Sequence, residues 1–236
     1  MRLFDHRIPA VFLMLALAML GCQQQDTPPR QAPASDASRQ TLQPDEGTIV
    51  AMGNSLTAGY RVAEEQAYPA RLEALLRSNG YRFRVVNAGI SGETSSGALS
   101  RTEWTLTLKP DIVILETGAN DGLRGVSPGV IQQNISAIVQ QLQQQNIVVI
   151  LAGMRMVENL GDVYTTAFAN VYQAISKTPG LIFMPFFLDG VGGNPELSQA
   201  DGLHPTADGY RHITAAIYPY VKTAIEQMRR NRRTAP

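Results

Sequence analysis

The sequence predicts a three-layer α/β/α domain built on a mostly parallel, five-stranded sheet. Short apolar runs rich in β-branched residues recur at intervals of about 30 residues, and helical patterns lie between them. Buried strands that alternate with helices form parallel β-α units, in which helices cover both faces of the sheet. The five expected strands span residues 48–52, 83–88, 111–117, 147–152 and 181–184.

Helix signals separate and follow these runs. One helix is expected to open at Tyr68-Pro69, with proline in its first turn, and to end at Asn79-Gly80. A second is expected to open at Ser127-Pro128, because isoleucines follow it at helical spacing. A kink is expected at Pro219 in the last helix. The remaining helices are expected over residues 163–176 and 206–228.

The N-terminal segment is typical of a targeting signal. Arg2 and Arg7 precede an apolar stretch over residues 8–20, which is shorter than the roughly 20 residues that span a membrane. It ends at Leu20-Gly21-Cys22, which resembles the lipobox of bacterial lipoproteins, with Met19 where leucine is usual. We therefore expect a lipoprotein signal peptide over residues 1–21 and lipidation of Cys22. An ordinary secretory signal with an incidental cysteine is the alternative.

Residues 22–46 are expected to form a flexible linker after the lipidated cysteine. They are rich in Gln, Ser, Pro, Ala and Asp and have almost no apolar side chains, so they cannot bury enough surface to offset the entropy of ordering. The folded domain is expected over residues 47–230, followed by a basic C-terminal tail over residues 231–236. A lipid anchor would place this domain in the bacterial cell envelope, on the periplasmic or outer-membrane side.

Composition narrows the classes of function. The chain has 20 basic and 20 acidic residues, and no nucleic-acid-binding motif occurs, so no nucleic-acid partner is expected. Cys22 is the only cysteine, which excludes an internal disulfide and a metal site built on thiolates. The 44% hydrophobic content suits a packed globular domain.

The polar motifs all fall where strands are expected to end or the last helix to begin. Gly53-Asn54-Ser55 follows the first strand, residues 89–94 follow the second, and residues 118–121 follow the third. Residues 201–205 precede the last helix. Because functional groups in parallel sheets gather at the carboxyl ends of the strands, these motifs are expected to meet at one edge.

A serine nucleophile with a histidine base accounts for these motifs. Ser55 lies in a turn of small residues after a strand, where its hydroxyl can be presented to a substrate. Only three histidines occur, and His6 lies in the signal peptide. His204 has Asp201 beside it to orient an imidazole, whereas His212 lies on an amphipathic helix. We therefore take His204 as the base; a capping role for Asp201 with a solvated imidazole is the alternative.

Three groups can stabilise a developing oxyanion. The candidate donors are the backbone N–H of Ser55 at a helix start, the backbone N–H of Gly92 and the side-chain amide of Asn120. Glycine at position 92 allows the backbone to approach a substrate closely. Taken singly, Gly92 fits an ordinary turn equally well, and Asn120 fits an Asx turn.

The order and spacing of these four blocks resemble the SGNH hydrolase superfamily, the GDSL lipases and esterases, over nearly the whole folded domain. Residues 120–125 and 185–187 most resemble its bacterial thioesterase/lysophospholipase/arylesterase branch. The resemblance implies a flavodoxin-like sheet and no metal or organic cofactor. It also implies Ser55 as nucleophile, Asp201 and His204 as the other triad members, and an oxyanion hole from Ser55, Gly92 and Asn120. The implied substrates are carboxylic esters, thioesters or lysophospholipids.

One residue departs from the family's motif. The usual Gly-Asp-Ser-Leu is Gly53-Asn54-Ser55-Leu56 here. Asparagine keeps one acceptor oxygen, loses the charge and gains two donors. We expect a modest effect on stability or rate, because the triad carboxylate is Asp201.

The substrate is only broadly defined by the sequence. Apolar side chains in residues 154–164 and 186–188 can either wall an acyl groove or belong to the core, with core favoured for Phe186 and Phe187. Two other functions remain open: a carbohydrate O-acetyl esterase, and a non-catalytic lipoprotein that binds acyl chains or glycans. The complete set of serine, histidine, aspartate and asparagine argues against a non-catalytic binder.

Overall fold

The computed structural model describes residues 45–156 and 160–234. Within these ranges, five parallel strands pair in the order β2-β1-β3-β4-β5. The predicted α/β fold with a parallel five-stranded sheet is therefore confirmed. The strands are β1 (Gly47–Gly53), β2 (Phe83–Gly89), β3 (Ile112–Glu116), β4 (Val148–Ala152) and β5 (Ile182–Met184).

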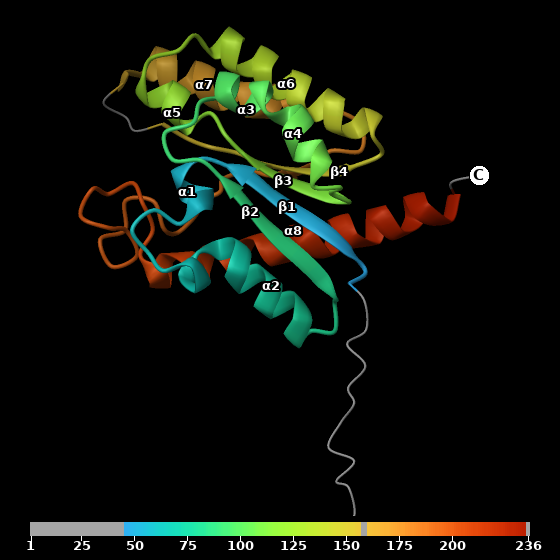
Figure 1. Cartoon of the computed structure of the whole chain (residues 1–236). Coiled ribbons are helices and arrows are strands. Elements are labelled where there is room, and N and C mark those ends of the chain that lie inside the picture. The colour runs from blue at the N-terminus through green and yellow to red at the C-terminus, as the bar shows by residue number, and fades with distance from the viewer. Residues whose placement is uncertain (1–44, 157–159, 235–236) are drawn as a thin grey trace, which may run out of the picture. The chain divides into compact units, whose positions relative to one another are not determined.

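Helices cover both faces of the sheet and produce three layers (Figure 1). The long helices α2 and α8 pack together on one face, whereas α3, α4, α6 and α7 lie on the other. The helices are α1 (Ser55–Ala58), the 3₁₀ turn η1 (Glu64–Gln66), α2 (Tyr68–Ser78), α3 (Ser95–Ser100), α4 (Thr102–Thr107), α5 (Ala119–Leu123), α6 (Pro128–Gln144), α7 (Asp162–Ile175) and α8 (Ala207–Thr234).

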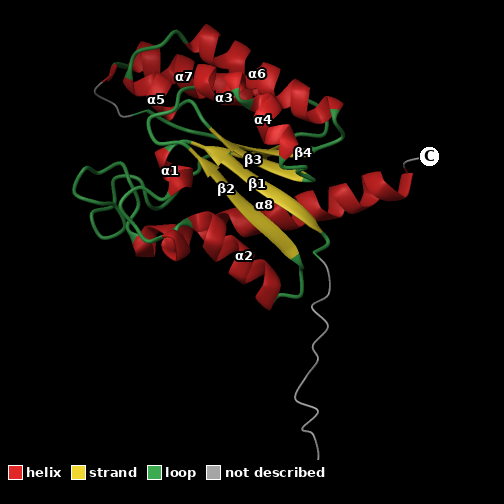
Figure 2. Ribbon diagram, viewed as in Figure 1, coloured by secondary structure: helices red, strands yellow, loops and turns green. Residues whose placement is uncertain are grey.

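Burial explains why the central strands carry almost continuous apolar runs. Every residue of β3 and β4 is buried, because helices shield both faces of these strands. The edge strand β2 instead alternates buried and exposed positions. All five strands are parallel, so their carboxyl ends lie at the same edge of the sheet, and Figure 2 shows β1 and β2 running toward α1. This edge therefore collects the polar motifs of the sequence.

The structure differs from the sequence-based expectation at both short and long helices. A helix start at Ser55 was expected and is α1, whereas the short helices α3, α4 and α5 were not expected as separate elements. Their few residues bury too small an apolar stripe to produce a periodic pattern. Helix α8 also continues to Thr234, beyond the expected end near Met228, and contains Pro219. Ion pairs from Arg229 to Glu46 and from Arg232 to Asp111 hold its last turns.

The N-terminal predictions fall largely outside the described residues. These are the signal peptide, Cys22 and all of the linker except its last two residues, Asp45 and Glu46. Residues 43–236 form one compact unit. None of the described helices is long and apolar enough to cross a membrane.

Candidate active site

The nucleophile turn begins where β1 meets α1. Asn54 is the N-cap of α1, and its Oδ1 accepts a hydrogen bond from the backbone N–H of Leu56 at 2.9 Å. Ser55 is the first residue of the helix, so its side chain stands at the carboxyl edge of the sheet. Gly53 packs so tightly that an added Cβ would lie 2.6 Å from the carbonyl oxygen of Glu116. A glycine at this position therefore permits the close contact between the β1–α1 turn and β3.

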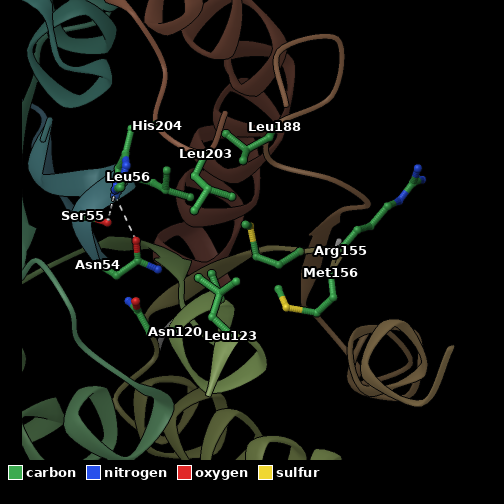
Figure 3. A pocket seen from close by; sticks show the side chains of 12 residues that line it. Asn54, Ser55, Leu56, Asn120, Leu123, Arg155, Met156, Leu188, Leu203 and His204 are labelled. Atoms are coloured by element: carbon green, nitrogen blue, oxygen red, sulfur yellow. Dashed lines mark hydrogen bonds between the residues drawn. The ribbon is translucent and has the colours of Figure 1, made fainter. Parts of the chain in front are cut away.

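His204 and Asp201 reach Ser55 from a loop 149 residues away in the chain. The Nε2 of His204 lies 2.9 Å from Ser55 Oγ, and its Nδ1 lies 2.8 Å from Asp201 Oδ2. An ionised carboxylate can only accept a hydrogen bond, so the imidazole presents N–H to Asp201 and its free nitrogen lone pair to the serine hydroxyl. Figure 3 shows the imidazole directly against Ser55. Three residues predicted from the sequence thus form one continuous hydrogen-bonded chain.

The carboxylate of Asp201 is held by its own loop. Partial burial by itself raises its pKa, but hydrogen bonds from the backbone N–H groups of His204 and Leu203 and from the imidazole outweigh this and lower the pKa to about 2. Asp201 therefore carries a negative charge at any pH where the protein is expected to work. This charge fixes the imidazole tautomer that can accept the serine proton.

Contacts outside the triad hold the histidine loop in place. The Tyr60 ring lies 4.6 Å from the His204 ring, centroid to centroid. The side-chain amide of Gln199 donates to the carbonyl oxygens of Tyr60 and Pro205, at 2.8 and 2.9 Å. The loop that carries His204 is thus tied to the segment that follows the nucleophile helix.

The three predicted oxyanion donors lie in the segments that follow β1, β2 and β3: Ser55 at the start of α1, Gly92 in the loop after β2, and Asn120 in α5. In the part of the chain that the structure describes, the backbone N–H groups of Ser55 and Gly92 have no protein acceptor. Gly92 has φ +82°, a left-handed conformation that favours glycine. Asn120 uses one N–H of its amide to donate to the carbonyl oxygen of Glu93 at 2.9 Å, which leaves its second N–H for a ligand.

Two polar networks hold the loop after β2, which carries Gly92 and Glu93, in place. The Glu93 carboxylate receives two 2.6 Å hydrogen bonds from the Arg101 guanidinium, and both side chains are nearly buried. Asp121 accepts from both the backbone N–H and the hydroxyl of Ser95, and Asn134 donates to the same hydroxyl. These contacts join the loop after β2 to the loop after β3. They carry the backbone of Gly92 and the side chain of Asn120 on one rigid framework.

A buried carboxyl lies directly under the nucleophile turn. Glu116, the last residue of β3, is 0% exposed and contacts Asn54 and Thr57 through hydrogen bonds. Burial raises its pKa to about 8, against the opposing effect of these hydrogen bonds. The sequence analysis did not identify this residue. The sequence feature that could have identified Glu116 is a charged residue inside the apolar run of residues 112–117.

A cavity of about 100 Å³ opens beside the serine (Figure 3). Its wall is mainly apolar, and the predicted groove segments contribute to it in part. Met154, Met156 and Leu188 line the cavity, whereas Phe187 is fully buried in the core, as the sequence favoured. The remaining lining residues are Asn54, Ser55, Leu56, Ala119, Asn120, Leu123, Arg155, Leu203 and His204.

The other site-related predictions have different outcomes. His212, the alternative base, is exposed on α8 and forms no part of the cavity lining. Cys22 lies outside the described residues. No group of three or more His, Cys, Asp or Glu residues in residues 45–156 and 160–234 is arranged to hold a metal ion.

Known proteins match the chain across the whole of this site. A model of the GDSL-like lipase/acylhydrolase family matches residues 51–212. Esterase TesA of Pseudomonas aeruginosa is 38% identical over 74% of this chain and 88% of its own length. The "Thioesterase 1/protease 1/lysophospholipase L1" of Escherichia coli K12 is 37% identical over 70% of this chain and 79% of its own.

Solved structures agree with the sequence matches. The psychrotrophic esterase EstA from Pseudoalteromonas sp., in a crystal structure inhibited by monoethylphosphonate, superposes with a TM-score of 0.73. It is 32% identical, and the match covers 77% of this chain and all of EstA. The similarity in fold therefore extends over most of this chain.

Proposed function

Because the chain belongs to the GDSL-like lipase/acylhydrolase family and is an enzyme that hydrolyses ester bonds, we propose that Ser55, His204 and Asp201 form its catalytic triad. The observation that carries this proposal is the unbroken chain of hydrogen bonds from the Ser55 hydroxyl through the imidazole to a carboxylate. This hydrogen-bonded chain opens onto the cavity, and the N–H groups of Ser55 and Gly92, which have no acceptor among the described residues, are donors of the kind that a serine esterase needs.

The first half of the reaction transfers the acyl group to the enzyme. The Ser55 oxygen attacks the ester carbonyl carbon while its proton passes to Nε2 of His204. The negative charge of Asp201 stabilises the imidazolium that forms. The carbonyl oxygen becomes an oxyanion and is met by the N–H groups of Ser55, Gly92 and Asn120. The tetrahedral intermediate then collapses, and the leaving alcohol takes the proton from Nε2.

The second half regenerates the serine. A water molecule attacks the acyl carbon of the ester with Ser55 and gives a proton to Nε2 of His204. The same three donors stabilise the second oxyanion. When the intermediate collapses, the Ser55 oxygen leaves and recovers the proton, and the carboxylic acid is released. No step needs a group from outside this set of residues and water.

The charge state of Asp201 predicts a simple pH dependence. With its pKa near 2, Asp201 stays ionised over the whole acid range of an assay, so it adds no second protonation to the acid limb that a general base produces. We expect kcat/KM to rise with pH along a limb of unit slope and then to level off. Initial rates measured in a constant-ionic-strength buffer series between about pH 4 and 7 check this. A limb of slope two would mean that a second group must lose its proton.

For the substrate, we propose an ester of an apolar acyl chain, with lysophospholipids and acyl thioesters as further members of the class. The apolar cavity wall beside Ser55, formed by Leu123, Met154, Met156 and Leu188, supports this choice. The names of the relatives include arylesterase, thioesterase and lysophospholipase. A carbohydrate O-acetyl esterase would need only a small acyl site, and the size and apolar character of this wall favour longer acyl groups.

The cavity predicts a preference among acyl chain lengths. Each methylene that enters an apolar cavity contributes about 0.8 kcal/mol, or about fourfold in kcat/KM. We expect p-nitrophenyl butyrate to be hydrolysed faster than the acetate, by about 15-fold, with octanoate showing whether the cavity is then full. A matched M156A variant enlarges the cavity and should move the preferred substrate to a longer acyl chain. An acetate optimum would instead support the O-acetyl esterase.

We propose that the enzyme is anchored in the bacterial cell envelope through a lipid on Cys22. The support is the sequence alone: a short apolar stretch that ends at Gly21-Cys22, followed by a linker poor in apolar residues. A lipid anchor would keep the domain near membrane lipids, where lysophospholipids arise. Metabolic labelling with a fatty acid should mark the full chain and spare a C22S variant.

A further inference from the structure

We propose that Glu116 is a positioning residue for the nucleophile, and that Glu116 and Asn54 act as a matched acceptor–donor pair beneath Ser55. The proposal rests on the assignment of Ser55 as nucleophile. It concerns a residue that does not touch the cavity and acts only through the turn that carries the serine. It also explains how this chain works with asparagine in place of the family's usual aspartate.

Both oxygens of the Glu116 carboxyl are occupied by the nucleophile turn. Oε1 accepts from the side-chain amide of Asn54 at 2.6 Å. Oε2 accepts from the backbone N–H of Asn54 at 3.2 Å and from the Thr57 hydroxyl at 3.0 Å. These donors come from the residue before Ser55 and from the helix that starts with it. The carboxyl therefore holds the serine from both sides along the chain.

The orientation of the Asn54 amide is determined by its surroundings. Its Oδ1 accepts from the backbone N–H of Leu56, which has no acceptor capacity of its own, so the NH₂ group must face Glu116. Glu116 consequently meets one N–H on each oxygen. A carboxyl group satisfies both, whereas an amide of the same shape has a single acceptor oxygen. Glutamine at position 116 would lose one of the two bonds in either orientation.

The same geometry shows what asparagine contributes at position 54. With aspartate there, the two facing carboxyl oxygens at about 2.6 Å would need a shared proton between them, and the raised pKa of Glu116 supplies one only below about pH 8. The Asn54 amide supplies that hydrogen permanently. Full burial makes an unmatched oxygen pair costly at this position. Asn54 is thus compatible with a fully active site, because its partner is a buried glutamate.

The pairing can be tested by exchanging the two side-chain types. E116Q should lower kcat by about 10- to 100-fold, with KM changed by less than about threefold, because the serine is misplaced while the cavity wall is intact. N54D/E116Q should recover most of the lost kcat. In the double variant, the introduced carboxylate accepts from Leu56 and from the introduced amide, whose oxygen accepts from the backbone N–H of residue 54.

Thr117 offers a matched control. Its hydroxyl is buried next to Glu116 in the chain and has no hydrogen-bond partner among the described residues. T117V keeps the shape of the side chain and should leave kcat unchanged. Thermal unfolding of all four proteins, measured alongside ester hydrolysis, separates a loss of folded protein from a misplaced serine. A T117V variant as impaired as E116Q would count against the proposal.

The outcomes distinguish this inference from the proposed function. If the unaltered protein hydrolyses esters and E116Q is equally active, the positioning role is wrong. If N54D/E116Q is no more active than E116Q, the matched pair is wrong. If E116Q fails to fold, the proposal requires that N54D/E116Q folds and hydrolyses esters, and failure of the double variant contradicts the matched pair. An unaltered, folded protein that hydrolyses none of the esters would instead contradict the proposed function.

Discussion

S55A is expected to lower kcat for ester hydrolysis by about 10⁴-fold or more, with little change in the folded state. The triad acts as a unit, so removal of its nucleophile eliminates the covalent route and leaves only the contribution of the oxyanion donors. Ser55 is partly exposed, and within the described residues its hydroxyl forms a hydrogen bond only with His204. Loss of this oxygen therefore leaves no cavity in the core. Steady-state hydrolysis of p-nitrophenyl butyrate measures the effect.

Covalent labelling provides an independent measurement of the same prediction. A fluorophosphonate should label the unaltered protein at Ser55 and leave S55A unlabelled. EstA, which this chain resembles, was crystallised in a form inhibited by monoethylphosphonate. S91A is the matched control, because Ser91 is exposed in the loop before Gly92. Labelling of S55A to the same extent as the unaltered protein would mean that another residue is the nucleophile.

H204A is expected to lower kcat by about 10³- to 10⁴-fold, whereas H212A should keep full activity. Without the imidazole, no group within reach of Ser55 Oγ can take its proton at neutral pH. His212 is exposed on α8 and lies outside the cavity wall, so its replacement tests for general effects of losing a histidine. The pair of variants decides between the only two histidines of residues 45–234.

The pH dependence of the two histidine variants sharpens this comparison. The residual activity of H204A should no longer show the acid limb of the unaltered enzyme, because the general base has been removed. H212A should keep the limb unchanged. If the two variants behaved in the opposite way, His212 would be the base, and the hydrogen bond between His204 and Ser55 would be structural only.

The oxyanion donors could be predicted from local sequence patterns. Ser55, Gly92 and Asn120 were predicted from small-residue turns at the ends of strands, and the structure places all three turns at one edge of the sheet. Their side-by-side position follows from parallel pairing, which turns each strand end toward the same side. The bracing contacts between Glu93 and Arg101 were not predicted, because an ion pair eight residues apart has no recognisable pattern in sequence.

The residues of the cavity wall, in contrast, could not be assigned from the sequence. The sequence identified residues 154–164 and 186–188 as apolar but could not assign each side chain to the wall or the core. In the structure, neighbours in sequence separate: Leu188 lines the cavity, whereas Phe187 is buried at 0% exposure. Which side of a loop faces a cavity depends on helices that pack against it, and no local periodicity encodes that choice.

The sequence by itself determined the parallel α/β sheet, the place of the site at its carboxyl edge, and the identity of Ser55, His204 and Asp201 as the groups to test. These follow from apolar periodicity and from turn motifs, which are local properties of the chain. Only the tertiary structure decided that Glu116 lies beneath the nucleophile and pairs with Asn54. That contact joins the last residue of β3 to the residue directly after the neighbouring strand β1, 62 positions away, and its hydrogen bonds exist only once the strands are paired and water is excluded.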